Sequence, residues 1–342
     1  MSKRSENYLR LLKIAIDTND LKKFSGNSIL VTGGTGLIGT SIVDIFIYLN
    51  EKLNKNIDIF VASRNYEHLV KRFGDICEKE YFHFVKYDAT KKINFNFQVD
   101  YIIQGASNAN PNLYMKKPVE TLMGNIIGLN NILDYALRQK TKRVVYISSS
   151  EVYGNKIEGR NKLINEEDFG LVDKLKPRFS YTNGKRAAEN LCIDYAYEYG
   201  IESIIIRPGH IYSSNISKGD NRAATDFLRC AYENRAIKMY SSGNQLRSYC
   251  HAIDCASAII FSLINGKNCQ AYNVSNKDSV VTIRQFAKEV AKIGQVNLKC
   301  GKVNDSNGME YSALDSRKLE NLGWHAVVNL QEGIKEAIAD LN

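Results

Sequence analysis

The chain has 342 residues, of which 44% are hydrophobic and 24% charged, an ordinary globular composition that suits about two domains and excludes a disordered or collagen-like chain. The net charge is +9, but Lys and Arg occur in scattered pairs, which favours a solvated surface over a nucleic-acid-binding face. We expect neither a signal peptide nor a membrane span, since charges interrupt the N-terminus and no apolar run approaches ~18 residues.

Short apolar runs alternate with amphipathic stretches along most of the chain, which predicts right-handed βαβ units around a parallel sheet. Strands are expected at Ser28–Thr32, Ile57–Ala62, Phe82–Val85, Tyr101–Ile103, Val144–Ser148 and Ile201–Ile206. Helices are expected at residues 6–20, Leu37–Leu49, Tyr66–Glu78, Pro118–Arg138, Tyr181–Tyr199, Asn221–Asn234 and Ile283–Ile293. The fold class is therefore α/β.

A glycine-rich turn follows the first expected strand, with Gly33, Gly36 and Gly39 spaced three residues apart. Gly33 would permit a tight turn, Gly36 the approach of a pyrophosphate, and Gly39 close packing of helix on strand. The first N–H groups of the next helix, at Leu37 and Ile38, would face the phosphates. A plain glycine turn is the alternative, but the strand-to-helix position favours a dinucleotide site in a Rossmann-type doubly wound parallel sheet.

The pattern of elements loosens near residue 207. We expect an N-terminal helical extension over residues 1–25, an NAD(P)-binding domain over 26–207, and a smaller C-terminal α/β substrate-binding lobe over 208–342. Some segments of the lobe are expected to return to the first domain. Because no Pro/Gly/Ser-rich linker separates the two larger parts, they should share one cleft.

The choice of dinucleotide stays open. The second expected strand ends without the acid that would bind the ribose hydroxyls of NAD. Ser63 and Arg64 stand there and could hold the 2′-phosphate of NADP, although Arg64 could equally be a surface residue that stacks on adenine. We give NADP a slight preference. Asp88, after the third strand, could accept a hydrogen bond from adenine or simply cap a helix.

A serine-rich strand end and a Tyr-x-x-x-Lys motif predict acid–base chemistry. Tyr181 and Lys185 are four residues apart and lie on one face of the expected helix, 32 residues after Ser149. The ammonium of Lys185, with a positive nicotinamide ring, should lower the pKa of Tyr181 from about 10 toward neutrality. Tyr181 could then remove a proton from a sugar hydroxyl, with Ser149 sharing that hydrogen bond.

Together these motifs resemble those of the extended short-chain dehydrogenases/reductases, in the nucleotide-sugar epimerase/dehydratase/decarboxylase family. The similarity runs from about Ser28 to Ala339 and includes several further segments: Gln104-Gly105-Ala106-Ser107, Asn125-x-x-Gly128-x-x-Asn131, Arg207-Pro208-Gly209, Arg247-Ser248-Tyr249-Cys250-His251 and Leu322-Gly323-Trp324. It implies that Ser149, Tyr181 and Lys185 are catalytic and that NAD(P) stays tightly bound and is recycled. The dinucleotide-binding candidates are Gly33, Gly36, Leu37, Ile38, Gly39, Ser63, Arg64, Asp88, Ala106, Ser107, Tyr181, Lys185 and Pro208.

Family members oxidise C4 of the sugar, and the resulting ketone acidifies the C5 proton or prepares a C5 carboxylate to leave. Glu151 indicates a further step at C5 or C6, because simple 4-epimerases generally carry a small or neutral residue there. The pair Ser150 and Glu151 is similar to decarboxylases and mannose-type dehydratases. Arg222 resembles a decarboxylase arginine near the sugar carboxylate, which a guanidinium can bind bidentately. The alternative for Glu151 is a surface loop carboxylate. The alternative for Arg222 is a surface residue at a helix N-terminus or a phosphate ligand.

We therefore expect an NAD(P)-dependent enzyme that oxidises C4 of a nucleotide sugar and favours decarboxylation or another C5/C6 step, as in cell-surface polysaccharide precursor synthesis. A C4 epimerase and an NAD(P)H-dependent reductase are the alternatives within the class. A non-catalytic dinucleotide sensor or an RNA-binding adaptor is a different class, which the intact catalytic motifs argue against. The candidates for substrate binding are Ser150, Asn108, Tyr114, His210, Arg222 and Arg247, where Arg247 resembles a ligand of the nucleotide diphosphate and His210 replaces the usual Asn.

The expected partner is a nucleotide sugar, with no nucleic acid, membrane or metal. Seven cysteines without a CxxC pair or metal-ligand cluster favour free thiols in a reducing cytoplasm. The family resemblance also implies a homodimer through a four-helix bundle, in which Pro118–Arg138 and Tyr181–Tyr199 of each copy would pack together.

Overall fold

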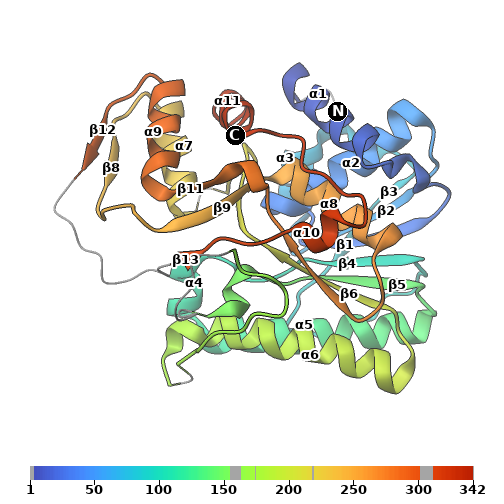
Figure 1. Ribbon diagram of the computed structural model, residues 1–342. Coiled ribbons are helices and arrows are strands. Elements are labelled where there is room, and N and C mark those ends of the chain that lie inside the picture. The colour runs from blue at the N-terminus through green and yellow to red at the C-terminus, as the bar shows by residue number, and fades with distance from the viewer. Residues whose placement is uncertain (1–3, 155–162, 174, 218, 301–310, 342) are drawn as a thin grey trace.

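A computed structural model describes residues 4–154, 163–173, 175–217, 219–300 and 311–341 of the chain (Figure 1). Its centre is a seven-stranded sheet in the order β10-β6-β5-β4-β1-β2-β3, and every neighbouring pair is parallel. The order reverses between β1 and β4, which is where open α/β sheets bind ligands at the carboxyl ends of their strands. The seven strands are β1 (Ser28–Thr32), β2 (Asp58–Ser63), β3 (Phe82–Lys86), β4 (Tyr101–Gln104), β5 (Arg143–Ile147), β6 (Ser203–Pro208) and β10 (Gln270–Val274).

Helices cover both faces of this sheet. α5 (Pro118–Gln139) and α6 (Ser180–Tyr199) lie side by side on the lower face in Figure 1, and bury Leu133 and Cys192 against the strands. On the other face, α2 (Leu37–Leu53) packs against α8 (Ala252–Asn265), and α1 (Glu6–Thr18) packs on α8. The expected α/β class and doubly wound parallel sheet are confirmed. The shorter helices beside the sheet are α3 (Tyr66–Phe73), α4 (Pro111–Lys116) and α10 (Arg317–Glu320).

The remaining elements form a smaller lobe over the carboxyl ends of the strands. A separate apolar cluster holds its helices together, with Leu228, Phe286 and Ile334 at its centre. β9 pairs with β7, β11 and β13, and β8 pairs with β12. The elements are β7 (His210–Tyr212), α7 (Ala223–Tyr232), β8 (Ile237–Met239), β9 (Leu246–His251), β11 (Val280–Thr282), α9 (Ile283–Ile293), β12 (Leu298–Cys300), β13 (Tyr311–Ser312) and α11 (Leu330–Ala339).

Two of the expected helix boundaries differ from the structure for a local backbone reason. The helix expected to reach Glu78 ends at Phe73, because Gly74 takes a positive φ of 56° and the chain continues as a 3₁₀ turn. The helix expected from Asn221 begins at Ala223, since Arg222 is the extended N-cap residue. After residue 207, as expected, some segments lie with the first domain: β10 pairs with β6 and α8 packs on α2.

A buried polar cluster ties the N-terminal extension to the rest of the fold. Arg4 contacts Asp44 of α2 at 2.7 Å and donates to the side-chain oxygen of Asn215 at 2.8 Å. Tyr8 donates to the same Asp44 carboxylate at 2.8 Å. Asn215 follows β7 and precedes the segment that carries Arg222. The extension therefore connects the helix after the glycine turn to the substrate side of the molecule.

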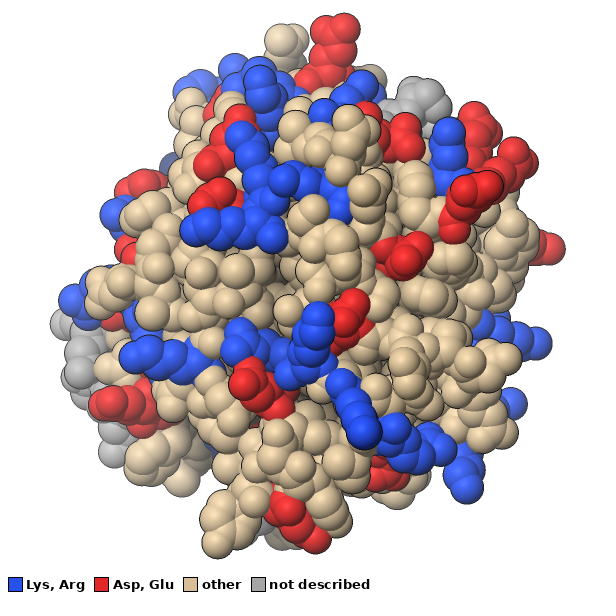
Figure 2. Space-filling view, turned by 90° about the vertical axis from the view of Figure 1, so that its right-hand side faces the viewer, with Lys and Arg blue, Asp and Glu red and all other residues tan. Residues whose placement is uncertain are grey.

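On the face shown in Figure 2, Lys and Arg form several separate groups with Asp and Glu between them. Some of the surface cations of the molecule are paired, such as Lys142 with Asp100 at 2.8 Å. This face thus carries mixed charge, as expected for a solvated surface. Among the described helices, none has the length and apolar character that a membrane crossing requires.

Candidate active site

The glycine turn has the geometry that close packing of strand, turn and helix requires. Gly33 has φ +69°, and a Cβ there would lie 3.0 Å from the Gly105 carbonyl carbon, so only glycine fits without a shift of the backbone. A Cβ on Gly39 would lie 2.1 Å from the Gly33 oxygen, which explains the third glycine of the motif. The Thr32 hydroxyl accepts from the N–H groups of Gly105 and Ala106 at 3.0 and 3.1 Å, joining the ends of β1 and β4.

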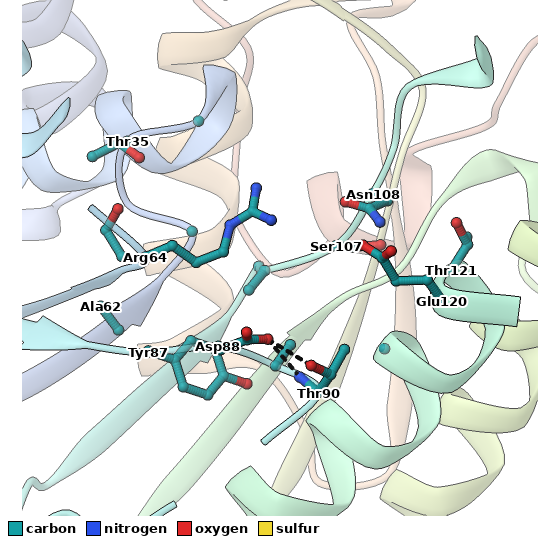
Figure 3. A pocket seen from close by; sticks show the side chains of 17 residues that line it. Thr35, Ala62, Arg64, Tyr87, Asp88, Thr90, Ser107, Asn108, Glu120 and Thr121 are labelled. Atoms are coloured by element: carbon teal, nitrogen blue, oxygen red, sulfur yellow. Dashed lines mark hydrogen bonds between the residues drawn. The ribbon is translucent and has the colours of Figure 1, made fainter. Parts of the chain in front are cut away.

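A cavity of about 250 Å³ opens beside this turn (Figure 3). Seven of the expected dinucleotide ligands line it: Gly33, Gly36, Ser63, Arg64, Asp88, Ala106 and Ser107. The sequence analysis did not single out several other lining residues, namely Thr35, Ala62, Tyr87, Ala89, Thr90, Gly105, Glu120, Thr121 and Gly124. The lining residues on α5 could not be recognised from a position at a strand end, because the helix contacts the cavity with its side. The narrow glycine wall and the open start of α2 fit the pyrophosphate of a dinucleotide.

The adenosine end of the cavity carries opposite charges. Arg64 extends into the cavity in Figure 3, across from Ser107 and Asn108. Asp88 accepts from the backbone N–H and the hydroxyl of Thr90 at 3.0 and 2.8 Å, and these bonds lower the pKa of Asp88. Its carboxylate is thus ionised and held in a turn, rather than at the start of a helix. The Ser63 hydroxyl donates to the Asn65 carbonyl at 3.4 Å.

The lining of the cavity does not include the expected nucleotide-side candidates Leu37, Ile38, Gly39 and Pro208. Leu37 and Ile38 begin α2 directly after Gly36. Gly36 is the extended N-cap residue, and it has no side chain that could satisfy the N–H groups of Leu37 and Ile38. Pro208 ends β6 beside Val274 of β10 and is buried. Asn108, expected to contact the sugar, lines the dinucleotide cavity.

Tyr181, Ser149 and Lys185 meet at the ends of β5 and α6. The Tyr181 side chain is buried, and the Ser149 hydroxyl is close enough to act on the pKa of Tyr181. The Lys185 ammonium donates to the Ile147 carbonyl at 2.6 Å and lies 5.7 Å from the centre of the Tyr181 ring. The Tyr114 ring stacks on Tyr181 with centres 5.4 Å apart. The structure therefore brings together the three residues that the motif spacing predicted.

The pKa of Tyr181 differs from the expectation. Burial, followed by the negative charge of Glu151, raises the pKa of Tyr181 above its usual value of 10, while Ser149 and the charge of Arg222 oppose this shift. The expected lowering by Lys185 is wrong for the chain by itself, because burial also lowers the pKa of that ammonium to about 7. In this arrangement the hydroxyl of Tyr181 keeps its proton near neutral pH.

Glu151 is held by side chains from three segments. Its carboxylate accepts from the Tyr114 hydroxyl at 3.3 Å, the Arg178 guanidinium at 3.1 Å and the Thr182 hydroxyl at 3.3 Å. Arg178 also lies over the Tyr114 ring, 5.0 Å from its centre. Sequence analysis missed Arg178, and its position three residues before Tyr181 was the available signal. The adjacent Ser150 is buried in the same turn.

A group of cations faces the tyrosine from the smaller lobe. Arg222 pairs with Asp220 at 2.5 Å, and its charge acts on both Tyr181 and His210. Arg247 of β9 is buried and acts on His210 and Glu151. Burial and these two arginines lower the pKa of His210 to about 3, so its imidazole is neutral. Within the described chain the Nδ1 atom of His210 is buried without a hydrogen-bond partner.

The arrangement combines a buried phenol, a carboxylate and several guanidinium groups beside a dinucleotide-shaped cavity. A phenol beside a serine hydroxyl can exchange a proton with a sugar hydroxyl. Guanidinium groups can bind diphosphate or carboxylate oxygens. No group of three or more metal-ligating side chains gathers in residues 4–154, 163–173, 175–217, 219–300 and 311–341.

Comparisons with known proteins agree with this chemistry. Residues 29–275 match the NAD dependent epimerase/dehydratase family. UDP-glucuronic acid decarboxylase 6 of Arabidopsis thaliana is 30% identical over 316 residues, covering 92% of this chain and 88% of that protein. UDP-glucuronic acid decarboxylase 1 of Danio rerio is 29% identical over 314 residues, covering 91% and 71%.

Solved structures show the same fold at lower identity. A UDP-glucose 4-epimerase from Thermotoga maritima has a TM-score of 0.78 and 19% identity, covering 92% of this chain and 98% of that chain. A dTDP-glucose 4,6-dehydratase from Bacillus anthracis in complex with NAD has a TM-score of 0.75 and 18% identity, covering 92% and 96%. At these identities the likeness concerns the fold alone.

Proposed function

Because the chain belongs to the NAD dependent epimerase/dehydratase family, we propose that it oxidises C4 of a nucleotide-linked hexuronate and releases the C5 carboxylate as carbon dioxide. The observation that carries this proposal is the set of guanidinium groups around Tyr181 and Glu151, with Arg222 and Arg247 on one side and Arg178 on the other. Relatives named UDP-glucuronic acid decarboxylase support the same reaction.

In this mechanism NAD bound in the cavity supplies the two-electron acceptor for C4 and later returns those electrons. Tyr181 takes the proton of the C4 hydroxyl, oriented by Ser149. The C4 ketone then accepts the electron pair of the bond between C5 and the carboxylate, and carbon dioxide leaves. Glu151 takes up a proton from solvent and delivers it to C5, and Tyr181 returns its proton to the C4 oxygen. The net change is uptake of one proton and release of one carbon dioxide.

The high pKa of Tyr181 suits the last step of this cycle more than the first. A buried phenol that holds its proton is a ready acid toward the C4 oxygen. As a base it needs additional positive charge, which an oxidised nicotinamide ring next to the phenol would bring. Arg222 already opposes the effect of burial on the tyrosine from the substrate side.

A panel of nucleotide sugars distinguishes this reaction from its alternatives. The purified chain with NAD is incubated with nucleotide-linked glucuronate, glucose and N-acetylglucosamine, and product masses are measured. Loss of carbon dioxide from the glucuronate supports the proposal. Loss of water indicates a dehydratase, an unchanged mass with altered configuration an epimerase, and a gain of two hydrogens a reductase, and each of these overturns it.

For the cofactor, we propose that the cavity accepts NADP as well as NAD. Ser63 and Arg64 line the adenosine end of the cavity, and no carboxylate from the end of β2 joins them in the described lining. A neighbouring groove continues from Arg64 past Lys86, Lys91 and Lys92, which adds positive charge near a 2′-phosphate. The family description and the dehydratase in complex with NAD support NAD itself.

We also propose a homodimer through α5 and α6. Their outer faces expose apolar side chains, with Val119 at 73%, Met123 and Ile127 four residues apart on α5, and Tyr197 at 93% on α6. A second copy that covers both helices would form a four-helix bundle. Tyr197→Glu should shift the molar mass measured by light scattering toward the monomer.

A cytoplasmic location is proposed on the absence of disulfides among the six described cysteines.

A further inference from the structure

The end of β5 is shared by two groups of the proposed mechanism. Ile147 accepts the Lys185 ammonium at its carbonyl, and Ser149 carries the hydroxyl beside Tyr181. The residue between them, Ser148, is buried, and its hydroxyl donates to the Glu189 carboxylate at 2.5 Å. Glu189 lies one helical turn after Lys185 on α6, so it contacts the strand end from the same helix that carries Tyr181 and Lys185.

Arg207 of β6 fixes the Glu189 carboxylate in turn. Its Nε donates to one carboxylate oxygen at 3.0 Å and its Nη2 to the other at 2.7 Å, a two-point contact between largely buried groups. Its Nη1 donates to the Tyr153 hydroxyl at 2.9 Å, at the end of the turn that begins after Ser149. Glu189 therefore joins α6, β5 and β6 next to the reacting groups.

The charge of Glu189 also reaches Lys185. Burial lowers the pKa of the Lys185 ammonium to about 7, and Glu189 is the first group that opposes this shift. The other titratable groups around the ammonium are Tyr181 and Cys192 on α6, Tyr146 on β5, and Arg207 beyond Glu189. Burial raises the pKa of Cys192 and Tyr146 well above neutrality, so both are uncharged.

We propose that Glu189 is a positioning residue for this reaction: its carboxylate fixes the strand end that carries Ser149 and places a negative charge one helical turn from Lys185. The proposal rests on the proposed function, because it assigns the Ser149, Tyr181 and Lys185 group to catalysis. The same strand pair offers a matched control. Glu202 and Arg143 join β5 and β6 at their other ends, with an Arg143 Nε to Glu202 distance of 2.8 Å, far from Tyr181 along the strands.

The test compares Glu189→Gln with Glu202→Gln. Lysines carrying carbon-13 at Cε are incorporated, and the Lys185 resonance, recognised by its loss in Lys185→Arg, is followed by NMR against pH. We expect titration near neutrality in the unaltered chain, a fall of on the order of one pH unit in Glu189→Gln, and none in Glu202→Gln. With the substrate that the product assay identifies, kcat should fall up to about 100-fold for Glu189→Gln alone and KM should change little.

Unchanged titration of Lys185 in Glu189→Gln overturns the proposal, even where kcat falls, because a purely structural role would leave that titration unchanged. Equal effects of the two Gln variants overturn it as well. Glu189→Asp retains the charge and should keep the titration close to that of the unaltered chain. Should Glu189→Gln not fold, Ser148→Ala is tested instead. It removes the hydrogen bond between Ser148 and Glu189 and leaves the ion pair between Glu189 and Arg207. It should then lower kcat with Lys185 titrating as before, and an unchanged kcat overturns the positioning role.

The NMR measurement requires no substrate. Its failure is therefore distinct from failure of the proposed function, which is read from the products of the unaltered chain.

Discussion

The dinucleotide cavity and the catalytic cluster are built in different ways. The cavity lies where β1, β2, β3 and β4 end, and its lining includes Gly33 and Gly36 of the glycine turn and Gly105 after β4. The cluster around Tyr181 instead consists of charged and aromatic side chains from segments far apart in the sequence, from Tyr114 to Arg247. Backbone geometry thus governs the first region and paired charges govern the second. Substitutions should act on cofactor affinity in the cavity and on turnover in the cluster.

The largest effect is expected for Tyr181→Phe. Loss of the hydroxyl removes the proton acceptor at C4, so kcat should fall by about 10³-fold, within the range for general acid–base groups. The ring still stacks on Tyr114, so the affinity for NAD should stay within about threefold. Steady-state kinetics and cofactor titration measure both. Tyr240→Phe, at an exposed tyrosine of the smaller lobe, is the control. Full activity of Tyr181→Phe would contradict the mechanism.

A second large effect is expected for Glu151→Gln, which separates the two halves of the reaction. The amide cannot deliver a proton to C5, but Tyr181 and Ser149 remain in place for oxidation at C4. Reduced nicotinamide should therefore accumulate in the near-ultraviolet absorbance while product formation falls by about 100-fold. The exposed Glu167→Gln serves as the control. Equal loss of reduced nicotinamide and of product would show that Glu151 acts before the proton transfer to C5.

The same contrast explains what the sequence could predict. The glycine turn and the Tyr181–Lys185 pair depend on local spacing, and both lie where the spacing indicated. Arg178 was missed because its contact with Glu151 exists only once the turn before α6 folds against the end of β5. The predicted lowering of the Tyr181 pKa was wrong for the chain by itself for a related reason. Burial of the phenol and the position of a neighbouring carboxylate depend on packing rather than on sequence spacing.

The N-terminal extension joins α2, which follows the glycine turn, to the segment that leads to Arg222, and Arg4→Ala tests that connection. The variant removes the guanidinium that pairs with the buried Asp44, so the free energy of unfolding should fall by about 3 kcal/mol. Arg10→Ala removes an exposed ion pair with Glu332 from the same extension and should cost at most about 0.5 kcal/mol. Urea unfolding of both variants gives the comparison. Equal urea midpoints of the two variants would mean that the contacts of Arg4 do not connect the extension to the rest of the fold.

The smallest effect is expected at the rim of the cavity, for Arg64→Ala. Arg64 is exposed, and its guanidinium faces the adenosine end without a role in the packing of the glycine turn. Loss of the charge should weaken NADP by about tenfold, because a 2′-phosphate loses a charged hydrogen-bond donor, and change NAD by less than about twofold. The ratio of the two dissociation constants, measured at one salt concentration, reports this difference.

The control is Arg138→Ala, at an exposed arginine on α5 outside the cavity lining, which should change neither dissociation constant. Equal weakening of both cofactors by Arg64→Ala would instead place its contact on adenine, where stacking does not distinguish NAD from NADP. Whichever outcome is found, kcat should be preserved, because substitutions in the cavity and in the catalytic cluster act on different steps.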